Sequence, residues 1–304
     1  MSDSDRLRRF LFERWPVRGQ FVRLDAAWRA VIEHHDYPPM LARCLGEAVA
    51  ANVLVAGTLK FKGRLVMQCQ GPGPVHLLVA ECTDRHAIRG LVRHRGELPA
   101  DTSLAALTGG GQLAVTLDSP QHTSRYQGVV PLAHPGLAAC LEDYFARSEQ
   151  LPTRLVLAAS AERAGGLLLQ RVAAGASASR PEDPVQAEEA DDAWRRIGLL
   201  ADTLTPEELL RQPLEVILHR LFNEDDLRLF DGSPVFFQCV CSRERVTGIL
   251  RSLGEAEVRG ILAEHGSVEV RCEFCNRAYQ FDAVDAARVF AGGSHPPSPA
   301  GGVH

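Results

Sequence analysis

The sequence predicts an α+β fold in three parts: a mixed sheet-and-helix N-terminal domain, a helical linker, and a small C-terminal module with four cysteines. Apolar residues recur every four positions over residues 39–60 and every second position over residues 64–70, so a helix precedes a strand. From residue 173 the chain becomes rich in Ala, Ser, Pro and acidic residues, which is typical of a linker. Two closely spaced pairs of cysteines follow within residues 232–290.

The composition is that of a globular protein with more than one domain. Hydrophobic residues make up 45% and charged residues 23% of the 304 positions, which excludes a wholly disordered or fibrous chain. The N-terminal segment carries acidic residues and lacks the apolar core of an export signal. The best apolar run, residues 48–59, contains Asn52 and falls short of the roughly 20 residues that span a bilayer. We therefore expect a cytoplasmic protein with no membrane partner.

Residues 1–177 are expected to form the N-terminal α+β domain. One apolar stripe marks a helix over residues 39–60, formed by Leu41, Leu45, Val49 and Val53. Residues 64–70 alternate as a strand does, and the turn at 71–74 leads into a second strand. A second helix carries apolar residues on one side and ends before Pro152. Further strand-like runs lie at 113–117, 125–131, 154–159 and 167–172.

Residues 178–231 are expected to form an acidic helical linker. Residues 180–230 hold 13 Asp or Glu against 6 Arg, although the net charge of the whole chain is only −5. The segment from Thr205 to Glu208 fits a capping box with proline at the first helical position. We expect the preceding helix to dock weakly, because its apolar stripe is narrow. The stripe consists of Trp194, Ile197, Leu200 and Leu204. Ordinary solvated helices packed on a core show the same pattern.

Four of the eight cysteines form two pairs, Cys239 with Cys241 and Cys272 with Cys275, separated by 30 residues. Chance gives roughly 0.2 pairs at any fixed spacing in such a chain, so two pairs in one module are a rare coincidence. Zinc prefers four tetrahedral ligands, and a C-x-x-C turn is the usual way to supply two of them. The pattern predicts one zinc ion per chain. Four thiolates leave no open position for a catalytic water, so we expect no enzyme activity there.

A four-thiolate site is either a static scaffold or a redox switch that loses its metal when the thiolates become disulfides. Thiolates are the reactive form, and we expect the neighbouring Arg243 and Arg271 to favour it. A module of this size builds little core, so metal binding of roughly 10–16 kcal/mol would be coupled to its folding. The residue pattern alone leaves both interpretations open.

Two runs around the cysteines are distinctive: CVCSRERVTGILRSLG and ILAEHGSVEVRCEFCNRAYQFDAVD. They resemble the zinc module of the heat shock protein 33 family, the redox-regulated holdase chaperones of the bacterial cytosol. The resemblance extends over nearly the whole chain, through LGEAVAANVLVAGTLKFKGRLVMQCQGPGPVHLLVAE, RYQGVVPL, CLEDYFARSEQLPTRLVLA, AGGLLLQ and LLRQPLEVILHRLFNEDDLRLF.

This resemblance implies a chaperone that is inactive while reduced and zinc-bound. Oxidation would join Cys239 to Cys241 and Cys272 to Cys275, release zinc and unfold residues 232–290. The linker, with its stripe acting as a latch, would then loosen and expose apolar surface that binds unfolding client proteins without ATP. The resemblance also implies that the oxidised, active form is a homodimer.

Two other classes of protein are less consistent with the sequence. A zinc ribbon that binds nucleic acid would use the same cysteines with a static structural zinc, but it needs a basic face, and the linker is acidic. An enzyme is not indicated, since GGGQLAVTL lacks the spacing of a phosphate-binding loop and His34 and His35 lack metal-ligand spacing. The tail, residues 291–304, is expected to be disordered. The remaining cysteines are expected to be buried small hydrophobes: Cys44, Cys69, Cys82 and Cys140.

Overall fold

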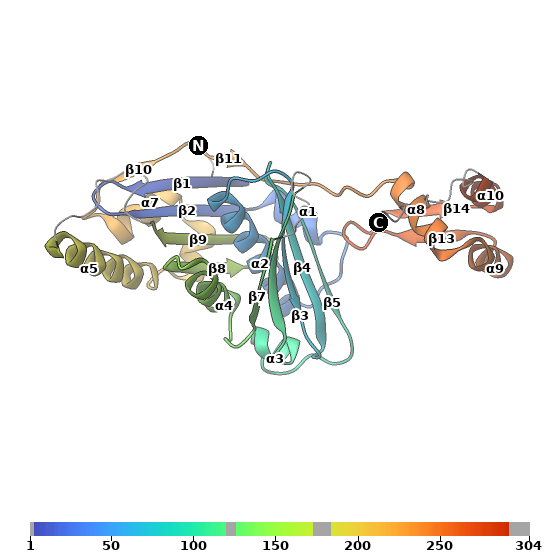
Figure 1. Cartoon of the computed structure of the whole chain (residues 1–304), viewed down its shortest axis with the longest axis horizontal. Helices are drawn as coiled ribbons and strands as arrows, with labels where there is room; N and C mark the ends of the chain where they lie inside the picture. The colour runs from blue at the N-terminus through green and yellow to red at the C-terminus, as the bar shows by residue number, and fades with distance from the viewer. Residues whose placement is uncertain (1–2, 120–125, 173–183, 292–304) are drawn as a thin grey trace, which may run out of the picture. The chain divides into compact units, whose positions relative to one another are not determined.

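The computed structural model describes residues 3–119, 126–172 and 184–291. Contacts divide the chain into two compact units, Met1–Gln238 and Cys239–His304 (Figure 1). The first residues of the expected linker, 178–183, and the expected disordered tail beyond residue 291 lie outside the described residues. The limits that the sequence suggested at residues 177 and 231 stay predictions.

The first unit is built on two six-stranded sheets. The first has the order β10-β1-β2-β9-β8, with β11 also pairing with β1, and all of its pairings are antiparallel. Its strands are β1 Arg6–Phe12, β2 Val17–Leu24, β8 Thr153–Ala159, β9 Ala164–Arg171, β10 Leu227–Leu229 and β11 Ser233–Pro234.

The second sheet has the order β12-β5-β4-β3-β6-β7 and is antiparallel except where β12 runs parallel to β5. Its strands are β3 Arg64–Gln70, β4 Val75–Thr83, β5 Ala87–His94, β6 Gln112–Asp118, β7 Tyr126–Pro131 and β12 Phe236–Phe237. The strands predicted near residues 64, 113, 125, 154 and 167 are all present. The helices that accompany the two sheets are α1 Ala26–Ile32, α3 Leu104–Thr108, α4 Leu137–Tyr144 and the π-helical turn Phe145–Glu149.

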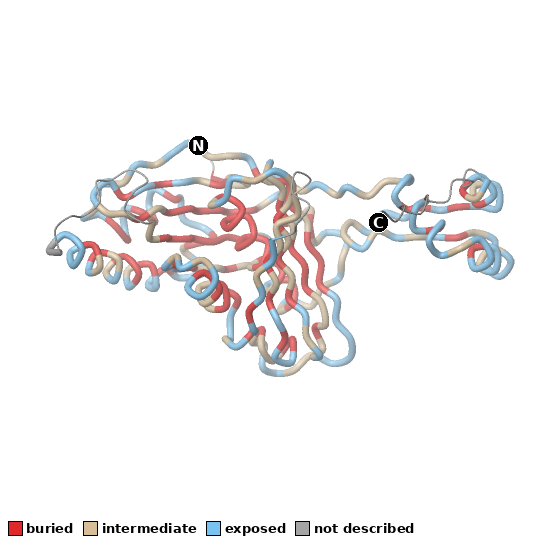
Figure 2. The backbone as a smooth tube through the Cα atoms, viewed as in Figure 1, coloured by how far each residue is buried: buried red, intermediate tan, exposed pale blue. Residues whose placement is uncertain are grey.

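Helix α2, Pro39–Thr58, is the central helix of this unit and packs against strands of both sheets. Figure 2 shows it buried together with the strands around it. Asn52 is fully buried, and its Nδ2 donates to the carbonyl oxygens of Leu65 at 3.1 Å and Ala80 at 2.9 Å. This polar residue therefore ties the helix to β3 and β4. Among the described helices, α2 alone is long and apolar enough to cross a membrane, but 83% of that window is buried inside the protein.

The linker helices cover the opposite face of the first sheet. They are α5 Pro184–Ala201, α6 Pro206–Arg211 and α7 Leu214–Phe222, and α6 begins with the predicted capping box. In the expected stripe Ile197 and Leu204 are buried, whereas Trp194 and Leu200 are half-buried. The docked face is broader than this stripe, because α6 and α7 add the buried residues Leu209, Leu210, Leu214, Ile217, Leu218, Leu221 and Phe222.

Polar contacts join the start of α7 to the sheet domain. Asp3 is buried, accepts a hydrogen bond from the backbone nitrogen of Leu214 at 2.9 Å, and pairs with Arg8 at 2.9 Å. Arg23 donates to the carbonyl oxygen of Gln212 at 2.6 Å. Since a buried carboxylate that loses its partners is strongly destabilising, this cluster fixes the start of α7 on the sheet.

The second unit is small. Helices α8 Arg243–Leu253 and α9 Glu255–His265 are followed by the hairpin of β13 Val268–Arg271 and β14 Ala278–Phe281 and by α10 Ala283–Ala291. Among the described residues, its core holds eight buried side chains: Val246, Leu250, Val258, Val268, Tyr279, Phe281, Ala286 and Val289. A core of this size supplies little stability without a further constraint.

One carboxyl group of α2 makes the stability of the first unit depend on pH. Glu47 lines a cavity of about 270 Å³, and burial raises its pKa from 4.5 to about 7, although Arg43 opposes the shift. Because the folded-state pKa is the higher one, stability present below pH 4.5 is lost as the pH rises towards 7.

Glu47→Gln should therefore stabilise the first unit at pH 8, by about 3 kcal/mol at most, and have no effect near pH 4.5. Hydrogen exchange in α2 measures this. The exposed Glu97→Gln is the matched control, and an equal gain in both variants at pH 8 contradicts the assignment.

Candidate metal centre

Cys272 and Cys275 lie in the turn between β13 and β14. The backbone nitrogen of Asn276 donates to the carbonyl oxygen of Cys272 at 2.7 Å, and that of Cys272 donates to the carbonyl oxygen of Arg277 at 3.0 Å. Asn276 has a φ of +53°, a left-handed conformation that asparagine tolerates better than most residues. The turn therefore places the two cysteines of the C-x-x-C pair close together.

Cys239 and Cys241 lie just before α8, on the segment that enters the second unit. Ser242 begins the helix, and its hydroxyl accepts a hydrogen bond from the backbone nitrogen of Arg245 at 3.3 Å. The cap fixes where the helix starts. Cys241 therefore directly precedes the capping residue Ser242, and Cys239 lies two residues before Cys241.

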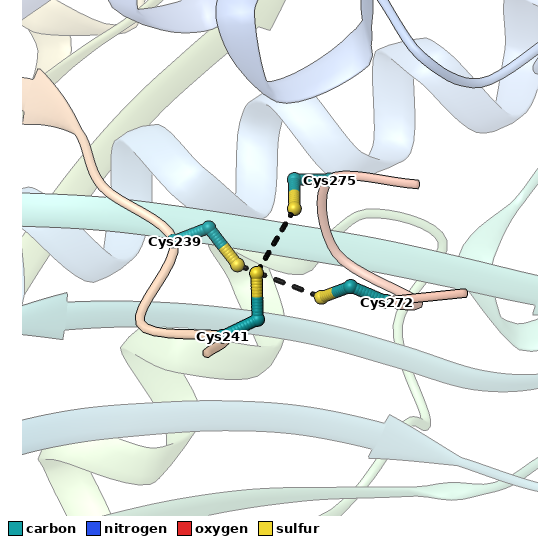
Figure 3. Close-up of side chains that lie close together, drawn as sticks. All are labelled: Cys239, Cys241, Cys272 and Cys275. Carbon is teal, nitrogen blue, oxygen red and sulfur yellow. Dashed lines mark hydrogen bonds between the residues drawn. The ribbon is translucent and has the colours of Figure 1, made fainter. Parts of the chain in front are cut away.

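The four cysteine sulfurs converge on one point, as Figure 3 shows. All four lie within 4.8 Å of one another, with Cys239 to Cys272 at 3.6 Å and Cys241 to Cys275 at 3.4 Å. Sulfurs bound tetrahedrally at about 2.3 Å from one zinc ion are about 3.8 Å apart, so this donor set fits such an ion. Within the part of the chain that the structure describes, no other group of three or more potential ligands gathers as closely.

Tyr279 and Arg277, which the sequence did not indicate, lie beside the thiols. The Tyr279 hydroxyl donates to the Cys241 sulfur at 3.1 Å, although the ring belongs to the core of the unit. Partial burial opposes ionisation of Cys241, but this hydrogen bond and the other three thiols together lower its pKa to about 7. The pKa of Arg277 is raised by its hydrogen bond with Tyr279 and by the charges of Cys241 and Cys275. The only available signal was the alternation of β14, which also describes an ordinary core tyrosine.

The expected role of Arg243 and Arg271 beside the thiolates is not seen. Arg243 pairs with Asp285 at 2.7 Å and lies over the ring of Phe281, with its Cζ 4.2 Å from the centroid. Arg271 pairs with Glu269 at 2.6 Å. Adjacency in sequence did not reveal that both guanidinium groups have carboxylate partners.

The other four cysteines belong to the first unit. Cys69, Cys82 and Cys140 are buried, as expected, and Cys44 is half-buried. Burial raises the pKa of Cys44 to about 11 and that of Cys69 and Cys82 to about 12. At neutral pH these side chains are therefore unreactive thiols.

Tyr279→Phe tests whether the tyrosine hydroxyl supports metal binding. The ring keeps its place in the core, so the unit should stay folded, but the loss of the hydrogen bond to Cys241 should weaken zinc binding about tenfold or more. Competition with a chromophoric chelator measures the affinity. Tyr126→Phe, in the first unit, is the control. Equal zinc affinity in the parent and in Tyr279→Phe would contradict the role.

Comparison with known proteins identifies the family. The family model described as Hsp33 protein matches residues 5–282. The 33 kDa chaperonin of Nitrosococcus oceani is 46% identical over 290 residues, covering 95% of this chain and 96% of that protein. That of Pseudomonas aeruginosa is 47% identical over 301 residues, covering 98% and 99%. A solved structure, the 33 kDa chaperonin (heat shock protein 33 homolog) of Thermotoga maritima, matches with a TM-score of 0.79 at 24% identity, covers 95% of this chain and 98% of that one, and has the same fold. The extent of the family match and the identity of these relatives show that the chain belongs to the Hsp33 family.

Proposed function

We propose that this chain is a redox-regulated, ATP-independent holdase chaperone, inactive while reduced and bound to one zinc ion. Membership of a family whose relatives are named 33 kDa chaperonins supports a chaperone rather than an enzyme. The convergence of four sulfurs within 4.8 Å carries the regulatory part of the proposal. Unfolding client proteins are the partners, the cytoplasm is the location, and the oxidised form is a homodimer.

Zinc is the ion that this donor set favours. Four thiolates form a soft, closed, tetrahedral site, which selects zinc over hard cations and leaves no position for a reacting water. Zinc binding supplies roughly 10–16 kcal/mol to the folding of small domains, which exceeds what a core of eight buried side chains contributes. Cys239, Cys241, Cys272 and Cys275 thus hold the fold of the second unit.

Oxidation removes these ligands. A peroxide takes two electrons from a pair of thiolates, a sulfur–sulfur bond forms, and the peroxide leaves with two protons as two waters. In the reduced protein two short sulfur distances run across the two pairs, from Cys239 to Cys272 at 3.6 Å and from Cys241 to Cys275 at 3.4 Å. Once the unit opens, however, cysteines two or three positions apart form the smallest loops. This supports disulfides within the pairs, Cys239 to Cys241 and Cys272 to Cys275.

Unfolding of the second unit should next loosen the linker, which belongs to the first unit. From α7 the chain passes through β10, β11 and β12 and reaches Cys239 two residues after β12 ends. These strands are only two or three residues long, so they are weakly held. Loss of the fold beyond Gln238 therefore loosens them and then the latch helices. Undocking exposes an apolar face of the first sheet that includes Phe10, Phe12, Val17, Phe21, Leu167 and Leu169, which we propose as the client surface.

The function is tested by light scattering of an aggregating client protein. The peroxide-treated chain should suppress aggregation, whereas the reduced, zinc-loaded chain should not. Native mass spectrometry should find one zinc per chain before oxidation and none after it, and peptide mapping should find disulfides within the two pairs.

Cys272→Ser combined with Cys275→Ser should abolish zinc binding. Cys44→Ser combined with Cys140→Ser, the matched control, should keep both zinc binding and oxidant-dependent protection. Two results stand against the proposal: equal protection by the reduced chain, or zinc that stays bound after peroxide, which would indicate a static structural site.

The latch is tested on two leucines near the end of α5. Leu204 is 5% exposed within the linker core, whereas Leu199 is 67% exposed. Leu204→Asn should weaken docking by about 3 kcal/mol, speed hydrogen exchange over residues 188–230 and give client protection without oxidant. Leu199→Asn should do none of these. If the Leu204 variant exchanges faster but stays inactive until oxidised, the linker is not the latch.

A further inference from the structure

The face of the first sheet that α2 covers continues past the end of that helix. On this face β1 and β2 place three pairs of residues opposite each other: Leu7 with Val22, Arg9 with Gln20, and Leu11 with Arg18. Leu7 and Val22 belong to the core beneath the helix, which ends at Thr58. The next two pairs therefore line a cavity of about 420 Å³ between the sheet, the end of α2 and the segment after β10.

The cavity is cationic. Arg9, Arg18 and Lys60 line it, and among the described residues none of them forms an ion pair. Arg18 donates to Oε1 of Gln170 at 3.1 Å, and burial, followed by the charge of Arg9, lowers its pKa. Asp231 is the one acidic residue in the lining. Three cations and one carboxylate leave two net positive charges in a partly enclosed space.

A buried amide faces the same cavity without a partner. Gln20 is only 3% exposed, and its Oε1 has no hydrogen-bond partner among the described residues. The backbone of Gly57 packs against it, since a Cβ there would lie 2.3 Å from this oxygen. A buried amide oxygen without a hydrogen bond is destabilising. The same amide carries an NH2 group, which can donate to an anion.

We propose that this cavity binds a small phosphate monoester with an apolar group. The two net positive charges match a phosphate dianion, and the guanidinium groups and the amide offer donors for its oxygens. Other residues of the lining are apolar and suit the organic part of the ligand: Leu11, Leu59 and Phe230. The cysteine site does not use this cavity, and the proposed client surface shares only Phe10 with its lining.

Binding should also hold the end of the linker on the sheet. Phe230 and Ser233 line the cavity from one side, and the backbone nitrogen of Phe230 donates to the carbonyl oxygen of Arg9 at 2.9 Å. A ligand bound by Arg9 and Arg18 and packed on Phe230 therefore stabilises this pairing. Hydrogen exchange at Phe230 should slow when the ligand is present.

The test is calorimetric titration of the reduced, zinc-loaded full chain with phenyl phosphate and, separately, with inorganic phosphate. Phenyl phosphate should bind saturably and more tightly than phosphate. Arg9→Gln should weaken it about tenfold, and the exposed Arg95→Gln, which makes the same change of charge elsewhere in the unit, should leave it unchanged. Gln20→Met should weaken binding without lowering thermal stability, because it removes an unsatisfied amide at nearly constant volume.

Three outcomes would overturn the inference. Phenyl phosphate that does not saturate at millimolar concentration excludes the site. An equal loss of affinity in Arg9→Gln and Arg95→Gln indicates general charge attraction. Binding that survives Gln20→Met, with exchange at Phe230 unchanged, places the anion outside the cavity.

Discussion

The convergence of four sulfurs is the constraint on which the second unit depends. Eight buried side chains form its core, and its cysteines come from a loop before α8 and from the turn of a short hairpin. Neither segment has regular pairing that would fix it against the other in the described structure. The proposed zinc ion would join both segments and tie the stability of the unit to the protonation and oxidation state of its ligands. A site of this kind responds to oxidants more directly than a large hydrophobic core does.

The first unit, in contrast, is built on a large hydrophobic core. Helix α2 is buried between two sheets, and the side chain of Asn52 joins it to β3 and β4 of the second sheet. The linker helices cover the other face of the first sheet. That layer combines apolar packing with ion pairs, and the buried cluster around Asp3 fixes one helix start. Part of the acidity of the linker has a structural use, because Glu189 pairs with Arg14 at 3.6 Å and Glu215 pairs with Arg8 at 3.4 Å.

The sequence predicted the elements whose periodicity is long and regular. Residues 64–70 and 154–159 alternate clearly and are strands, and the helix predicted over residues 39–60 ends only two residues early, at Thr58. The β1–β2 hairpin was missed, because Arg9 and Arg18 occupy the inward face where the helix no longer covers the sheet. Strands β10 to β12 are too short to show any period, so only tertiary pairing defines them.

Only some residues of the candidate site could likewise be predicted from the sequence. Paired cysteine spacing identified the four sulfurs because structural zinc sites commonly take their ligands as closely spaced pairs. It did not reveal Tyr279, since a hydroxyl aimed at a sulfur looks, in sequence, like any tyrosine of a short strand. Nor did it show that Arg243 and Arg271 turn towards carboxylates. Spacing along the chain determines which ligands meet, whereas the groups that tune them depend on side-chain direction. The cysteine spacing therefore predicts the sulfurs themselves but not the residues that surround them.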